Sequence, residues 1–306
     1  MVRARSAYCS LRSPDLLAGT PAGERLEARL MDSTPGNGGG FVEAPYFYTA
    51  EDAARVNIAL EIPIADLSFE KSKTGRMLAT VRILGVAYRP DGAVAARFSD
   101  SARLDLDTQQ LEAMRQRTFH HENQIEMATG AYKVKIVYSA AENKFGRMEI
   151  PLSIEAYDGK EFTLSALALS NDIRTAPASA IGSTPAEDQT PLIAEGLLIV
   201  PSGSNRFRRG DRAVLYAEAY EAPFGDATPP EVAVILKIKD RMSGAEKDNS
   251  GLIRVSGPGL WERTKVKVGL RLPLEKIGPG AYRVELTAYD SAGRKTPVRT
   301  TDLDVE

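Results

Sequence analysis

The most informative stretch of this sequence is Gly130-Ala131-Tyr132-Lys133-Val134-Lys135-Ile136-Val137-Tyr138, because a similar one returns 150 residues later as Gly280-Ala281-Tyr282-Arg283-Val284-Glu285-Leu286-Thr287-Ala288. Each copy has a turn glycine, a tyrosine two positions later, and apolar residues at every second position. This period is that of a half-buried β-strand. The repeat predicts a chain built from two similar domains.

The composition is compatible with two domains and excludes several classes of function. The 306 residues suffice for two ordinary cores. With 39 Lys plus Arg, 41 Asp plus Glu and a net charge of -2, the chain lacks the field that gathers nucleic acid or an anionic membrane surface. A single cysteine, Cys9, excludes an internal disulfide and a cysteine-rich zinc site. No apolar run predicts a membrane span, and we find no export signal.

Residues 1–40 are expected to form an extended N-terminal segment with a short helix. The segment Val2–Tyr8 alternates as one strand would, and Thr20 followed by Pro21 offers an N-cap with proline at the first helical position. The stretch Pro35–Gly40 contains four glycines and predicts a flexible joint. We therefore place the first domain boundary there.

Residues 41–157 are predicted to form the first β-sandwich. The stretch Met77–Tyr88 is apolar on both faces, and the turn residues Pro90–Gly92 precede a return of the apolar alternation, which predicts a hairpin. Asp107 followed by Gln110 resembles a capping box at the start of a helix of two or three turns.

Residues 158–306 are predicted to form the second sandwich, with an exposed loop at 176–190 that is rich in Ala, Ser, Pro and Thr. The strand Val214–Tyr220 parallels Val56–Ile62 of the first domain, and apolar residues alternate from Val266 to Leu274 before the second copy of the repeat.

Many short strands with Gly, Pro and Asp turns and little helix predict an all-β fold of two tandem immunoglobulin-like antiparallel β-sandwiches with one or two short helices. Tyr132 and Tyr282 resemble the tyrosine corner of immunoglobulin-like domains, in which the hydroxyl binds a nearby backbone group. The hairpin from Pro279 to Gly293 is similar to that of many bacterial immunoglobulin-like and fibronectin type III modules. The motif describes a fold and says nothing about ligands.

Several stretches together resemble the C-terminal region of the von Willebrand factor A-related (VWFA-related) proteins of Acidobacteria, over nearly the whole chain. They are Val2–Tyr8, Asp15–Gly19, Tyr46–Tyr48, Ala54–Pro63, Leu84–Tyr88, Ala95–Asp100, Leu167–Asn171 and Pro201–Phe207. The A domain itself is missing. Its Asp-x-Ser-x-Ser metal motif does not occur in this sequence, so no cofactor or metal is carried over.

The resemblance implies a secreted or periplasmic protein, although we find no signal peptide in this sequence. We also expect that the chain is a truncated or split form of a longer frame, because Val2–Tyr8 is similar to the exit strand of the A domain.

The histidines and the acidic residues favour structural roles. His120 and His121 are adjacent on a predicted strand, so their side chains point to opposite faces and cannot chelate one ion. Asp100, Asp105 and Asp107 could line a calcium site, but they lack the glycine and distal glutamate of an EF-hand loop. We therefore predict no metal site.

The aromatic residues Tyr46, Tyr48 and Trp261 could form a stacking platform for a sugar. In a strand, Tyr46 and Tyr48 share one face and Phe47 takes the other, which also suits a core-facing edge. We prefer the core-facing role.

No nucleophile elbow, phosphate loop, dinucleotide fingerprint or zinc-protease helix occurs, so an enzyme is not expected. The sequence favours a structural or protein-interaction module with a protein partner that it does not identify. A carbohydrate-binding accessory module is the alternative, and a regulatory tail that packs on an A domain of another chain is a third hypothesis.

Overall fold

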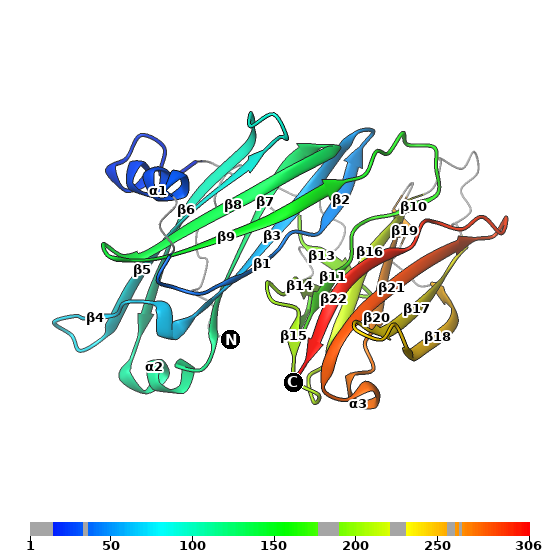
Figure 1. The fold of residues 1–306 in the computed structure, drawn as a ribbon. Helices are drawn as coiled ribbons and strands as arrows, with labels where there is room; N and C mark the ends of the chain where they lie inside the picture. The colour runs from blue at the N-terminus through cyan, green and yellow to red at the C-terminus, as the bar shows by residue number, and fades with distance from the viewer. Residues whose placement is uncertain (1–14, 33–35, 177–189, 221–230, 256–260, 263–264) are drawn as a thin grey trace. The chain divides into compact units, whose positions relative to one another are not determined.

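The computed structural model describes residues 15–32, 36–176, 190–220, 231–255, 261–262 and 265–306, and these divide into two compact units (Figure 1). Unit 1 is Met1–Ala44, Val56–Glu155 and Glu187–Gln189, and unit 2 is Pro45–Arg55, Ala156–Ala186 and Thr190–Glu306. Cys9, the strand expected at Val2–Tyr8 and nearly all of the loop expected at 176–190 lie outside the described residues.

Within the described residues, the division differs from the expected one at Pro45–Arg55 and by two residues at the boundary between the domains. The boundary expected after Tyr157 lies close to the observed division after Glu155. Pro45–Arg55, which we expected in the first sandwich, belongs to unit 2. The physical reason is that Phe47 of this segment is fully buried in an apolar cluster with Tyr216 and other residues of unit 2.

The described residues of unit 1 form two α-helices, one short 3-10 helix and two antiparallel sheets. Its elements are α1 (Pro21–Met31), β1 (Phe41–Glu43), most of β3 (Ala53–Pro63), η1 (Ile64–Asp66), β4 (Glu70–Lys71), β5 (Met77–Tyr88), β6 (Val94–Leu106), α2 (Thr108–Met114), β7 (Thr118–Ala128), β8 (Gly130–Ala141) and β9 (Lys144–Ile154). In one sheet β5 pairs with β4, β6 and β8, and β8 pairs with β9; in the other β1 and β7 pair with β3.

Local sequence signals explain the hairpin and both helix starts in unit 1. The predicted hairpin is confirmed, because β5 and β6 pair along their length. The predicted caps are confirmed as well: the Thr20 hydroxyl accepts a hydrogen bond from the Gly23 amide, and Asp107 and Gln110 form a capping box.

The glycines of Pro35–Gly40 serve a close approach, and the flexible joint expected there is not what the described residues 36–40 show. The amides of Asn37 and Gly38 donate to the Phe145 carbonyl, so the segment runs beside β9. The Tyr138 hydroxyl donates to the Gly39 carbonyl at 2.7 Å. A Cβ at Gly38 would lie 2.3 Å from that hydroxyl oxygen, so a side chain has no room here.

The described residues of unit 2 form the remaining strands and one short helix. Its elements are β2 (Tyr46–Ala50), β10 (Thr163–Leu164), β11 (Ala168–Ser170), β12 (Asp172–Thr175), β13 (Leu192–Ala194), β14 (Leu197–Val200), β15 (Arg206–Phe207), β16 (Val214–Tyr220), β17 (Val232–Asp240), β18 (Glu246–Val255), β19 (Trp261–Glu262), β20 (Lys265–Arg271), α3 (Leu274–Ile277), β21 (Gly280–Asp290) and β22 (Arg299–Val305).

One sheet of unit 2 has the order β15-β22-β21-β17-β18, and the other has the order β10-β16-β20-β19 with β11 also paired to β16. Their facing side chains form one apolar core, which includes Leu215, Val234, Val268 and Val284. A third sheet, β12-β14-β13, contributes to a separate apolar cluster around Tyr216.

The strand expected to continue to Leu274 ends at Arg271. Pro273 lacks a backbone donor for the sheet and precedes α3, in which Leu274 is buried. The fold class is confirmed: each unit is a β-sandwich of the immunoglobulin-like kind, antiparallel apart from the short parallel pair of β15 and β22. The described residues contain three α-helices and one 3-10 helix, where the sequence predicted one or two short helices.

Candidate interaction surface

The outer face of the β6-β5-β8-β9 sheet in unit 1 is covered by α1. Leu84 and Val86 of β5 and Val137 of β8 point away from the sandwich core. On this outer side they form a buried cluster with Leu26 and Leu30 of the helix. This contact explains why Met77–Tyr88 is apolar on both faces. One face lines the core and the other binds the helix.

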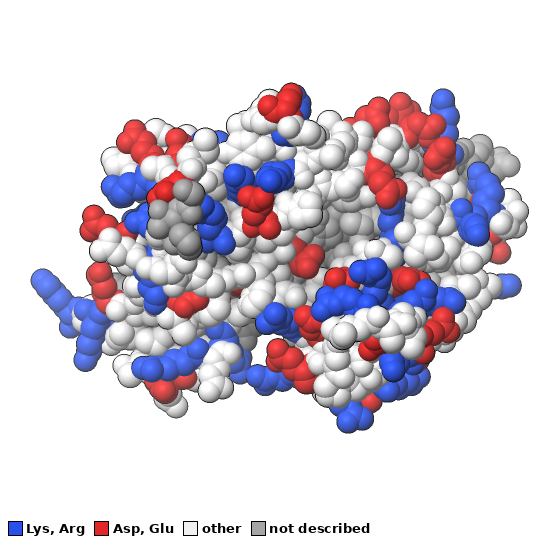
Figure 2. Space-filling model, in the orientation of Figure 1, with Lys and Arg blue, Asp and Glu red and all other residues white. Residues whose placement is uncertain are grey.

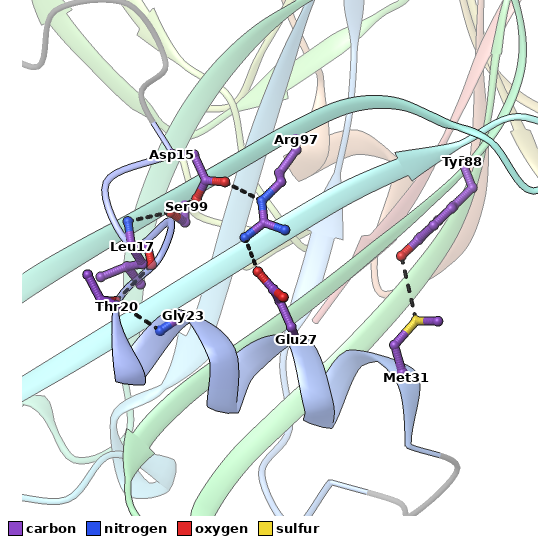
Figure 3. Close-up of polar contacts among 9 residues, drawn as sticks. All are labelled: Asp15, Leu17, Thr20, Gly23, Glu27, Met31, Tyr88, Arg97 and Ser99. Atoms are coloured by element: carbon purple, nitrogen blue, oxygen red, sulfur yellow. Dashed lines mark hydrogen bonds and ion pairs between the residues drawn. The ribbon is translucent and has the colours of Figure 1, made fainter.

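Polar contacts hold the segment before α1 against β6 (Figure 3). The Arg97 guanidinium donates to the carboxylates of Asp15 and Glu27, and the Ser99 hydroxyl donates to Asp15. The Leu17 amide donates to the Ser99 hydroxyl at 2.8 Å. Burial alone would lower the pKa of Arg97, but the hydrogen bonds and charges of Glu27 and Asp15 outweigh it and raise the pKa. The clamp therefore keeps Arg97 charged.

The equivalent face of unit 2 can be located from strand register. Leu84 pairs with Val137 in unit 1, and Ile235 pairs with Thr287 in unit 2, where Thr287 is the repeat counterpart of Val137. Two residues farther along each strand, Val86 corresponds to Lys237. The next outward position has Tyr88 in unit 1 and Lys239 in unit 2. Tyr88 pairs with Lys133 and Lys239 pairs with Arg283, and these two partners are counterparts in the repeat.

This face of unit 2, formed by β18-β17-β21-β22, is only partly buried. Ile235, Lys237, Lys239 and Thr287 are all half-exposed. Leu252 pairs directly with Ile235 across the strands and is 63% exposed. The face thus presents the apolar side chains of Ile235 and Leu252 beside Thr287, and we call these three residues the unit 2 patch.

Ion pairs border the unit 2 patch. Lys237 Nζ lies 2.9 Å from Glu246, and Lys239 Nζ lies 2.8 Å from Glu285. The hydrogen bond between Lys237 and Glu246 raises the pKa of the lysine and lowers the pKa of the glutamate. On the side of the molecule drawn in Figure 2, Lys and Arg are interspersed with Asp and Glu, in agreement with the balanced composition.

Tyr46 and Tyr48 do not form an exposed platform. Their side chains are buried and their ring centroids lie 5.5 Å apart. Tyr48 also packs on Tyr157 and Tyr220, with centroids at 4.7 and 5.3 Å. Trp261 lies in β19, where its backbone pairs with Val266, but its side chain is not among the described parts. The three-residue sugar platform therefore stays a prediction.

A buried carboxylate lies beside this tyrosine cluster, and the sequence analysis did not identify it. Glu218 is 2% exposed. It accepts hydrogen bonds from the hydroxyls of Tyr216 at 2.8 Å and Tyr220 at 2.5 Å, and its Oε1 lies 3.2 Å from Lys265 Nζ. Burial, followed by the charge of Glu218, raises the pKa of Tyr220. The arrangement satisfies the carboxylate with three donors, which suits a structural network.

The signal that could have indicated this network is the order Tyr216, Glu218, Tyr220 within an otherwise apolar strand. These three side chains share one face of β16, since strand residues alternate. A glutamate between two tyrosines on one strand face is a natural acceptor for both hydroxyls.

The two histidines lie in β7 with their side chains on opposite faces, as the sequence predicted from their adjacency. His121 shares its face with Phe119, on which it stacks with centroids 6.2 Å apart, and its Nε2 lies 3.4 Å from Asp100 Oδ2. His120 is buried, and its Nε2 lies 3.2 Å from Glu122 Oε1. Burial lowers the pKa of His121 and outweighs the opposite effect of Asp100.

The three aspartates considered for calcium have separate partners. Asp100 lies beside His121, Asp105 pairs with Arg76 at 2.6 Å, and Asp107 caps α2. Within the described residues, no group of three or more His, Cys, Asp or Glu side chains is arranged to hold a metal ion.

Tyr132 and Tyr282 both make the local hydrogen bond of a tyrosine corner. The Tyr132 hydroxyl donates to the Ala128 carbonyl at 2.9 Å, and the Tyr282 hydroxyl lies 2.7 Å from the Ile277 carbonyl. Gly130 and Gly280 precede them with φ of 143° and 155°. These positive φ values explain why both copies of the repeat begin with glycine.

No family model and no curated protein matches this sequence. The solved structures to which the chain is similar at low identity include the following three. They are a protein described as a β-galactosidase from Bacteroides fragilis (16% identity, 42% of this chain and 17% of that one, TM-score 0.27), the fibronectin(III)-like modules of Clostridium thermocellum CbhA (13%, 88% and 94%, 0.20) and the BSP domain of a biofilm associated protein (11%, 94% and 56%, 0.22).

The chain spans only 17% of the first of these proteins and 56% of the third. Because all three TM-scores are low, the fold assignment rests on the sheets described above. Among the described helices, none is both long and apolar enough to cross a membrane.

Proposed function

We propose that the protein is a non-enzymatic protein-interaction module, and that unit 2 binds its partner through the unit 2 patch. The observation that carries the proposal is the difference between equivalent sheet faces. In unit 1 this face binds an amphipathic helix through Leu84, Val86 and Val137. In unit 2 the same face leaves Ile235 and Leu252 accessible.

The partner that fits is a protein segment with an apolar stripe and a polar border. Ile235, Leu252 and Thr287 supply the apolar contact, and burying them removes apolar surface from water. Lys237 and Lys239 already have acidic neighbours, so the border is close to neutral. Recognition would then depend on shape and apolar contact more than on charge.

The non-enzymatic part of the proposal is supported by the groups that could act as acids or bases. Among the described residues, Glu218 is held by two phenol hydroxyls and a lysine, and the side chains of His120 and His121 are only 3% and 10% exposed. Such groups stabilise a fold and have no free reach toward a substrate.

We further propose an extracytoplasmic role as the tail of a VWFA-related protein, with an A domain of another chain as one candidate partner. Both statements rest on the sequence resemblance given above. Binding of a purified A domain, weakened by Ile235→Asp, would support them. Absence of binding at micromolar concentrations would oppose the A domain and leave the interaction module to the next experiment.

The interaction is tested by photo-crosslinking in an extract of the cells that make the protein. A photoreactive residue at position 252 should give one defined product, whereas the same residue at Val298, an exposed position in the same unit, should not. Excess wild-type protein should suppress the product, and excess Ile235→Asp protein should not. Absence of a product at position 252, or equal suppression by both competitors, contradicts the proposal.

The carbohydrate-binding alternative is tested by a glycan array. Buried Tyr46 and Tyr48 offer no open stacking surface, which favours the interaction module. Saturable sugar binding that is lost in Trp261→Ala or Tyr48→Ala would replace our proposal with the alternative.

A further inference from the structure

Both histidines of the chain lie where unit 1 passes from one sheet to the other. β6 is an edge of the first sheet, α2 follows it, and β7 pairs with β3 in the second sheet. The pair of His121 on β7 and Asp100 on β6, with Nε2 and Oδ2 3.4 Å apart, therefore connects the edges of the two sheets. We call this contact the β6-β7 seam.

The surroundings of His121 suit a neutral imidazole and not a charged one. Its side chain is 10% exposed and shares a strand face with the buried apolar residues Phe119, Ile125 and Met127 and with the buried Asn123. The charged groups that act on it are Asp100, Glu122 and His120. Among the described residues, its Nε2 has no hydrogen-bond partner in good geometry.

Protonation of His121 therefore costs unit 1 stability. Burial lowers the pKa of His121, and the neighbouring His120 lowers it further, while Asp100 and Glu122 oppose this only in part. A base with a depressed pKa binds its proton more readily in the unfolded state. The stability that it supports is complete above the unfolded pKa of about 6.5 and declines as the pH falls below that value.

We propose that the β6-β7 seam is an acid-sensitive latch: as the pH falls below about 6.5, conformations in which β6 and β7 have separated and His121 is protonated in water become more populated, and water reaches the edge of the unit 1 sandwich. Unit 2 contains no histidine, so it has no equivalent device. When the two copies of the repeat are aligned with a one-residue gap before Gly130 and Gly280, the apolar Leu270 occupies the place of His121, and it packs against the unit 2 core.

Hydrogen exchange of the full chain between pH 7 and pH 5, corrected for intrinsic exchange rates, tests the latch. Protection of β6 and β7 should fall by up to about tenfold per pH unit, the limit for one proton. Protection of β17 and β21 should change by less than about twofold, because unit 2 contains no histidine that takes up a proton in this pH range. An equal response in the two units, or none in either, overturns the proposal.

Two variants move the response in opposite directions, which a merely structural role would not do. His121→Leu removes the titrating group and should flatten the pH dependence of β6 and β7. Asp100→Asn removes the main opposing charge and should steepen it. If His121→Leu fails to fold, proton NMR of the wild type decides, because only two imidazoles titrate. A midpoint for His121 at or above 6.5 contradicts the latch.

Discussion

The two sandwiches of this protein use the same sheet face in different ways. In unit 1 the outer face of β5 and β8 is apolar and lies under α1. In unit 2 the outer face of β17 and β21 carries lysines in ion pairs and remains partly exposed. Val86 lies beneath α1 in unit 1, and the corresponding position of unit 2 is Lys237, which is paired with Glu246.

The comparison also separates two ways of completing a small core. Unit 1 adds an apolar helix and a clamp around Arg97. Unit 2 covers one face of β16 with aromatic side chains and a buried glutamate. The helix cover is stabilised by apolar burial, whereas the aromatic cover also depends on every polar atom having a partner.

Val86→Lys should have the largest effect. It places an ammonium group beneath Leu26 and Leu30, so we expect α1 to detach and unit 1 to lose about 3 kcal/mol. Urea denaturation measures the loss, and hydrogen exchange of Pro21–Met31 reports the helix.

The matched control is the reverse change, Lys237→Val, which should leave unit 2 close to wild-type stability because this position is half-exposed. Unchanged protection of α1 in Val86→Lys would show that this position does not decide helix packing.

Glu218→Gln should have an intermediate effect. The amide cannot accept from both phenol hydroxyls and neutralise Lys265, so we expect unit 2 to lose about 2 kcal/mol. Urea denaturation provides the measurement. Glu246→Gln, at an exposed ion pair of the same unit, should cost much less. Equal losses in the two variants would mean that burial of Glu218 adds nothing.

Tyr132→Phe and Tyr282→Phe should have the smallest effects, about 1 kcal/mol each, because each removes one hydrogen bond and retains the ring. Each loss should be confined to the unit that contains the substitution. Hydrogen exchange of β8 and β21 separates the two. Denaturation curves that coincide with the wild type would show that the corners do not stabilise these units.

Much of the fold could be predicted because its signals are local. Alternating residues after Gly130 and Gly280 predicted two equivalent strands, and Thr20-Pro21 and Asp107-Gln110 predicted two helix starts. Strand period and capping depend on residues a few positions apart, so a sequence displays them directly.

The errors arose where distant segments meet. The glycines of Pro35–Gly40 resembled a joint, but they allow the chain to approach Tyr138. Burial of Tyr46 and Tyr48 agrees with the core-facing role preferred from the sequence, but the sequence did not show that Tyr48 packs on Tyr157 and Tyr220, which are remote in the chain. Glycine occurs both in flexible joints and at close backbone approaches, and tyrosine occurs both on exposed binding surfaces and in cores. The residue type alone therefore does not distinguish these roles.

The sequence by itself determined the repeat, the strand period, both tyrosine corners and the helix caps, since each follows from neighbouring residues. Only the tertiary structure decided that α1 covers the apolar outer face of β5, that Glu218 joins a tyrosine cluster and that His121 faces Asp100. The physical reason is that burial and side-chain pairing depend on which distant surfaces meet, whereas strand periodicity shows which face of a strand is buried and not which residues cover it.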